Sequence, residues 1–170
     1  MLGRATRLLV DLNRPAGHPR CFSEFSKTLD RDDRAELLET IHQPYWQDYE
    51  ARVSEPGRCV HLACHSFVPV LEGRQRLVDI GLLFDPGREP EAGWCRRLLD
   101  GLRLEFPFFR IHSNQPYRGT SSGLGQYHRA RFGADKLLSA ELEISQALIE
   151  SASWPRLRSR LIDVLVARLF

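Results

Sequence analysis

Two histidines, His61 and His65, lie four residues apart in the apolar run 59–70. The apolar and β-branched residues of this run predict a buried strand. On a strand the two histidines share a face but lie ~13 Å apart, whereas the ligands of one zinc ion must each come within ~2.1 Å of it. The pair therefore cannot bind one ion. His61 is best interpreted as a hydrogen-bonded core histidine, and His65, at the strand end beside Ser66, as a candidate metal ligand or acid–base group.

Two glutamates, Glu141 and Glu143, form a second candidate pair within the predicted strand 137–144. They share a strand face and lie ~6.6 Å apart along it. Because two ionised carboxylates are costly to bury without partners, we expect them to face a cleft or arginine side chains. A glutamate near a strand end can act as the general base that activates water. An ordinary half-buried strand would give the same pattern, so both interpretations stay open.

Two polar loops carry further candidates. Asn13 and Arg14 follow the first predicted strand, and Asn114 and Arg118 lie in a later loop. An arginine can bind a carboxylate through two parallel hydrogen bonds, and an asparagine adds a neutral donor. Each pair alone is also compatible with an ordinary solvated loop.

Composition narrows the class of protein. The 170 residues predict one domain, 1–170, that can bury its own core. A net charge of +2 is too small to predict binding to nucleic acid or to a membrane surface. No apolar run approaches the ~20 residues of a membrane span, and residues 1–10 lack the pattern of a signal peptide. We expect a cytoplasmic protein whose four cysteines are reduced core residues: Cys21, Cys59, Cys64 and Cys95.

The elements that must position these groups alternate between strands and helices. Pro44 predicts a break near Gln43 in one of the helices, and residues 15–31 are predicted to form a loop. This order predicts an α/β fold with a largely parallel or mixed sheet. Strands are predicted over residues 7–13, 59–70, 78–85, 108–112 and 137–144, and helices over 32–53, 90–105, 123–132 and 155–169.

Five segments together resemble the N-formylglutamate amidohydrolase family. They occur in the family's order and cover nearly the whole chain. The resemblance implies a phosphorylase/hydrolase-like, three-layer α/β/α sandwich around a mixed sheet, as in the zinc carboxypeptidases. The segments are VDLNRP (10–15), HSFVPV (65–70), DIGLLFDP (79–86), NQPYRG (114–119) and ELEI (141–144).

The resemblance also implies a reaction, the zinc-dependent hydrolysis of an acidic N-acyl amino acid such as N-formyl-L-glutamate. His65 matches a zinc-ligand position and Glu143 the general acid/base position. Glu141 matches less well, because Glu143 is the one followed by the isoleucine and polar residue of the motif. Four residues would bind the substrate: Asn13, Arg14, Asn114 and Arg118.

The chain departs from the family pattern at its start. The family carries its first zinc ligands, a histidine closely followed by an acidic residue, upstream of Asp11, but residues 1–10 contain no His, Asp or Glu. Since a catalytic zinc needs about three protein ligands, we expect an N-terminally truncated form with an incomplete zinc site. The alternatives are a metal-free protein that binds carboxylates or peptides without catalysis, and a fragment whose exposed sheet edge leads to self-association.

Overall fold

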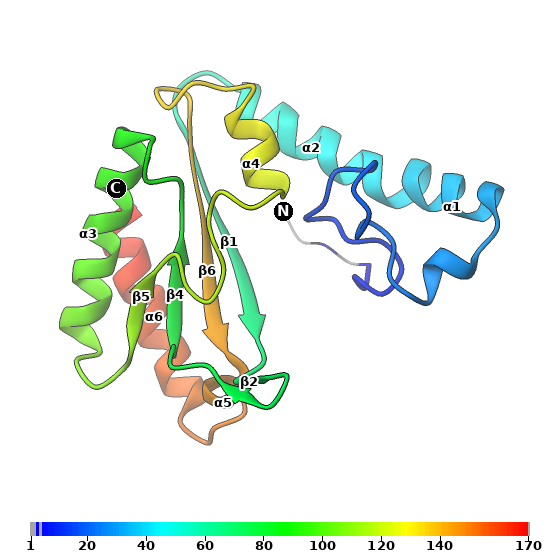
Figure 1. The fold of residues 1–170 in the computed structure, drawn as a ribbon. Coiled ribbons are helices and arrows are strands. Elements are labelled where there is room, and N and C mark those ends of the chain that lie inside the picture. Colours follow the sequence, from blue (N-terminus) through cyan, green and yellow to red (C-terminus); the bar gives the residue numbers. More distant parts are fainter. Residues whose placement is uncertain (1–2, 4, 170) are drawn as a thin grey trace. The chain divides into compact units, whose positions relative to one another are not determined.

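The computed structural model describes residue 3 and residues 5–169, so the outermost residues of the predicted domain (1, 2, 4 and 170) lie outside the described residues. The chain forms two compact units, shown in Figure 1. The first contains Met1–Cys59 and Ser122–Leu137, and the second contains Val60–Ser121 and Leu138–Phe170. Each unit has its own cluster of buried apolar side chains.

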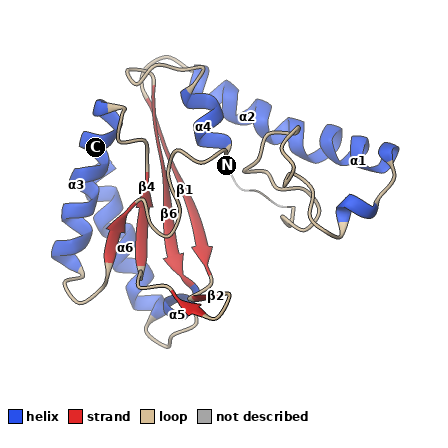
Figure 2. Ribbon diagram, viewed as in Figure 1, coloured by secondary structure: helices blue, strands red, loops and turns tan. Residues whose placement is uncertain are grey.

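A mixed four-stranded sheet forms the centre of the second unit (Figure 2). Strand β4 pairs parallel with β5 and antiparallel with β6, and Ile80 of β4 lies opposite both Ile111 and Ile144. A short antiparallel hairpin, β2 (Val70–Leu71) with β3 (Arg74–Gln75), follows β1. In spatial order the sheet contains β1 (Cys59–Phe67), β6 (Leu137–Ser145), β4 (Ile80–Leu83) and β5 (Ile111–Ser113).

Helices α3 (Glu89–Glu105) and α6 (Trp154–Leu169) pack side by side and cover one face of this sheet. A short helix, α5 (Gln146–Ile149), adds apolar side chains to the same core. Because successive strand residues point to opposite faces, only the even-numbered residues of β6 enter this core. These are Leu138, Ala140, Leu142 and Ile144.

The predicted α/β class with a mixed sheet flanked by helices is confirmed. Four of the predicted strands are present as β1, β4, β5 and β6, and three predicted helices as α3, α6 and α4 (Leu124–Arg129). The third layer of the sandwich stays a prediction, because the described helices of the second unit all pack against one core. No helix in the described ranges is long and apolar enough to cross a bilayer.

The first unit is built mainly from helices. A 3₁₀ turn, η1 (Ser26–Thr28), lies in the predicted loop and precedes α1 (Arg31–Leu37), which continues through one π-helical turn, η2 (Leu38–His42), into α2 (Gln43–Ser54). The predicted break near Gln43 is confirmed, since the irregular turn ends there and Pro44 occupies the first turn of α2.

The predicted first strand, 7–13, is wrong. This segment forms turns, in which the N–H of Arg14 donates to the carbonyl of Asp11 at 2.9 Å. The Asp11 carboxylate also accepts the N–H of Asn13 at 3.0 Å. Such local side-chain bonds compete with strand pairing. Val10 is fully buried, but Leu8 and Leu9 are exposed, so this apolar run does not form one buried face.

Asp30 caps helix α1, since its carboxylate accepts the N–H of Asp33 at 2.8 Å. One prediction on the cysteines needs correction. All four cysteines are free thiols, but Cys64 is exposed and is not a core residue. Its strand, β1, lies at the edge of the sheet, where fewer neighbours cover it.

Candidate functional site

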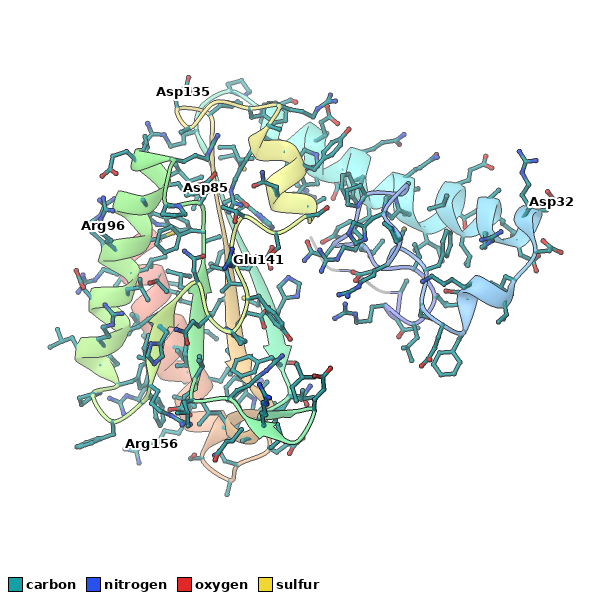
Figure 3. The ribbon with its side chains drawn as sticks, viewed as in Figure 1. Asp32, Asp85, Arg96, Asp135, Glu141 and Arg156 are labelled. Carbon is teal, nitrogen blue, oxygen red and sulfur yellow. The ribbon has the colours of Figure 1, made fainter. Side chains whose placement is uncertain are left out.

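The sheet face opposite the α3–α6 core carries a group of polar side chains, which we call the polar face. It is formed by odd-numbered residues of β1 and β6, because the even-numbered residues of β6 and Leu62 of β1 pack on the opposite side, against the core. The predicted sharing of one face by Glu141 and Glu143 is therefore confirmed. Figure 3 shows Glu141 projecting from the central part of the sheet. The polar face contains His61, His65, Ser139, Glu141 and Glu143.

His65 lies beside Glu141 on this face. Its Nε2 is 4.0 Å from Glu141 Oε2, and the two side chains are 34% and 20% exposed. That ring nitrogen is buried and makes no hydrogen bond with any described residue. A buried polar atom without a hydrogen-bond partner is costly. The His65 imidazole and the Glu141 carboxylate are therefore suited to bind a ligand or a proton between them.

Glu143 is buried at 5% exposure and lies opposite Gly81 of β4. A Cβ on Gly81 would lie only 1.9 Å from the carbonyl oxygen of Gln115 and 3.5 Å from the Cβ of Glu143. The loop 114–119 therefore passes directly over Gly81, next to Glu143. Only glycine allows the backbone of this loop, which we call the covering loop, to approach the sheet so closely.

Asn114 holds the covering loop in place. Its side-chain oxygen accepts the N–H of Phe84 at 3.1 Å and the N–H of Gly119 at 2.9 Å. Its backbone adopts a positive φ of 53°. The predicted role of Asn114 in substrate binding stays a prediction, and this oxygen is already used to position the loop. Arg118, in the same loop, is exposed and forms no ion pair with the described residues.

His61 is hydrogen-bonded as predicted, but it is half-buried on the polar face and is not a core residue. Its Nδ1 lies 2.9 Å from the hydroxyl of Ser139. The N–H of Ser139 donates to the carboxylate of Glu91 at 2.9 Å, and the other oxygen of that carboxylate accepts the N–H of Asp85 at 2.9 Å. Glu91, completely buried in the first turn of α3, thus links the ends of β4 and β6.

Two further residues, Glu91 and Arg76, are not among the candidates that the sequence pattern indicates. The guanidinium of Arg76 lies over the rings of Phe67 and Tyr117 and donates to the Tyr117 hydroxyl at 2.9 Å. No local pattern marks either residue, because their partners are distant along the chain. The alternation of β1, which gives Phe67 the same face as His65, is the one available signal.

Asn13 and Arg14 belong to the first unit. The side-chain oxygen of Asn13 accepts the N–H of Leu124, the first residue of α4, at 3.1 Å. The Nε of Arg14 is buried without a hydrogen bond among the described residues and lies 4.0 Å from an Asp11 oxygen. The second unit brings His65 and Glu143 onto one face, whereas the role of Asn13 and Arg14 in substrate binding stays a prediction.

A catalytic zinc requires about three protein ligands and one open position. The orphaned Nε2 of His65 and the nearby Glu141 carboxylate could supply two donors. Over residues 5–169 and residue 3, however, no group of three His, Cys, Asp or Glu side chains could hold a metal ion. The donors present therefore do not fit a complete catalytic zinc site.

Comparison with known proteins adds independent evidence. A family model described as N-formylglutamate amidohydrolase matches residues 1–150. The crystal structure of gene product Atu2144 from Agrobacterium tumefaciens is similar, with a TM-score of 0.68 and 25% sequence identity. That similarity covers 95% of this chain and 68% of the Atu2144 chain. No curated protein matches this chain.

Proposed function

Because the chain belongs to the N-formylglutamate amidohydrolase family, we propose that it hydrolyses the linear amide bond of an acidic N-acyl amino acid. N-formyl-L-glutamate is the substrate that the resemblance favours, with formate and glutamate as products. The observation that supports this proposal is the polar face, where His65 and two glutamates lie beside a tightly packed loop.

Amide hydrolysis needs a base that activates water and an acid that protonates the leaving nitrogen. We assign both steps to Glu143. It takes a proton from water as the water oxygen bonds to the acyl carbon, and it delivers that proton to nitrogen as the C–N bond breaks. Burial at the foot of the covering loop suits this role, because it excludes competing water from the carboxylate.

Binding of the acidic substrate is assigned to Arg14 and Arg118, with Asn13 and Asn114 as neutral donors. The buried Nε of Arg14 has no hydrogen-bond partner among the described residues, and the Arg118 side chain is exposed. Both guanidinium groups therefore retain donors for a carboxylate.

Zinc is the cofactor that the family resemblance predicts, with His65 as one ligand. The described donors fall short of the usual three, so metal content is the first quantity to measure. The purified chain would be dialysed against excess zinc, then against buffer, and its zinc measured by atomic absorption. One tightly held ion per chain would support the zinc enzyme, and none would contradict a zinc-dependent reaction by this chain.

The activity test follows formate and glutamate release from N-formyl-L-glutamate, with added zinc and with a chelator. Stoichiometric release of both products supports the hydrolase. Absence of both products with added zinc as well as with chelator would contradict it.

The second candidate is a metal-free protein that binds small carboxylates without catalysis. The absence of a three-donor group among the described residues favours it. It predicts that N-formyl-L-glutamate binds equally well with and without chelator and is recovered intact. Self-association through the edge strand β1 also stays a prediction, which size-exclusion chromatography at several concentrations would test.

A further inference from the structure

Arg76 is held in one position by contacts on several sides. Its guanidinium carbon lies 5.6 Å from the ring centre of Phe67 and 4.9 Å from that of Tyr117. Its Nη1 donates to the Tyr117 hydroxyl at 2.9 Å, and its backbone N–H donates to the carbonyl of Pro69 at 2.9 Å. Arginine suits such a place because its planar group stacks on aromatic rings while its edge keeps hydrogen-bond donors.

Most of the hydrogen-bond donors of the Arg76 guanidinium are not used by the described residues. A guanidinium carries five N–H donors, and the Tyr117 hydroxyl accepts one of them. No carboxylate pairs with Arg76 in the part of the chain that the structure describes. Other arginines of the second unit do have such partners, as Arg110 has in Asp79 at 2.6 Å. The half-buried Arg76 therefore keeps its charge and most of its donors for a ligand.

The two rings that hold Arg76 belong to the elements of the candidate site. Phe67 follows His65 by two residues on β1 and therefore shares the polar face. Tyr117 lies in the covering loop, which passes over Gly81 beside Glu143. Arg76 thus lies at the border of the polar face, between the end of β1 and the covering loop.

We propose that Arg76 binds a carboxylate of the acidic N-acyl amino acid and so determines specificity for acidic substrates; this inference rests on the substrate class of the proposed function. Two parallel N–H donors of the guanidinium face the carboxylate oxygens. Tyr117 positions Arg76, and its own O–H remains available to donate to the same carboxylate. The positive charge also offsets repulsion between an anionic substrate and the glutamates of the polar face.

A purely structural role makes a different prediction. If Arg76 only joins the hairpin to the covering loop, its loss would weaken binding of charged and neutral ligands alike. The decisive quantity is therefore the ratio of two dissociation constants, for N-formyl-L-glutamate and for its uncharged diamide. Calorimetric titration of the full chain gives both. A Glu143→Gln background, checked by formate assay, keeps the probes intact.

We expect the parent chain to bind the diacid more tightly than the diamide. Arg76→Gln should bind the diacid about tenfold more weakly, whereas its affinity for the diamide should change less than about twofold. Tyr117→Phe, which keeps the ring, should lose a smaller part of the preference. Arg74→Gln is the control, since it removes an exposed hairpin charge two residues away and should leave the ratio unchanged.

The inference is overturned if Arg76→Gln retains the preference for the diacid, if both affinities fall together, or if the parent chain shows no preference. Thermal melting of each variant identifies misfolding. If Arg76→Gln is misfolded, the same two affinities are compared for Tyr117→Phe. Because binding is measured without turnover, a chain that binds through Arg76 but releases no formate would contradict the hydrolase and leave this inference standing.

Discussion

The Nε2 of His65 lies 4.0 Å from the Oε2 of Glu141, across the neighbouring strands β1 and β6. The sequence motif favours Glu143, and not Glu141, as the general base. The structure separates their surroundings, since Glu141 faces the imidazole and Glu143 lies buried beside Gly81 and the covering loop. One glutamate can therefore orient the histidine while the other moves protons.

This division of roles predicts different losses of activity. Glu143→Gln should lower kcat about 10²- to 10⁴-fold, because it removes general acid–base catalysis. Glu141→Gln should lower it about tenfold, because it removes one charged contact of His65. Steady-state kinetics on N-formyl-L-glutamate measure both, with the exposed Glu39→Gln as control. A larger loss for Glu141→Gln would reverse the two assignments.

Replacement of Gly81 by alanine should destabilise the protein. The added Cβ would lie 1.9 Å from the carbonyl oxygen of Gln115, so the covering loop must shift. We expect a loss of about 1–3 kcal/mol in the free energy of unfolding, typical of overpacking. Urea denaturation measures it.

Gly93→Ala in α3 is the matched control. The nearest atoms to its new Cβ are flexible arginine side-chain ends at 3.9 Å, so the helix should gain about 0.5–1 kcal/mol. Equal effects of the two substitutions would contradict the close approach of the loop.

Loss of the Glu91 carboxylate should be costly. Glu91→Ala leaves the N–H groups of Asp85 and Ser139 without this acceptor, at about 1–3 kcal/mol for each buried donor. The control Glu89→Ala removes a mostly exposed carboxylate paired with Arg96 and should cost less than about 1 kcal/mol. Urea unfolding compares them, and similar small losses would rule out the linking role of Glu91.

The first unit should lose stability in acid through His128. Burial lowers the pKa of this histidine from its ordinary value of 6.5, and its ring packs 4.5 Å from that of Tyr49. A lowered pKa in the folded state means that the unfolded chain binds the proton more readily. The stabilising contribution is therefore complete above about pH 6.5 and is lost as the pH falls through the folded pKa.

The measurement is the free energy of unfolding between pH 8 and 5. His128→Phe should flatten this dependence, because it removes the buried imidazole that takes up the proton. An unchanged slope in His128→Phe would show that other groups cause the acid sensitivity.

The sequence by itself determined the features that depend on local chemistry. Alternation along 137–145 places Glu141 and Glu143 on one face, because the side-chain period of a strand is two. Pro44 marks the break before α2, because it lacks the backbone donor of a helix interior. The order of motifs was sufficient to indicate the family.

Only the tertiary structure decided the contacts between distant segments. Residues 7–13 have an apolar pattern typical of a strand, but they form turns in which only Val10 and Asp11 are buried, and no local signal reveals this. Glu91 reaches a residue 48 positions away, and Arg76 reaches one 41 positions away. These hydrogen-bond partners come together only when the sheet, the covering loop and α3 pack against one another. Side-chain contacts depend on distance in space and not on separation along the chain.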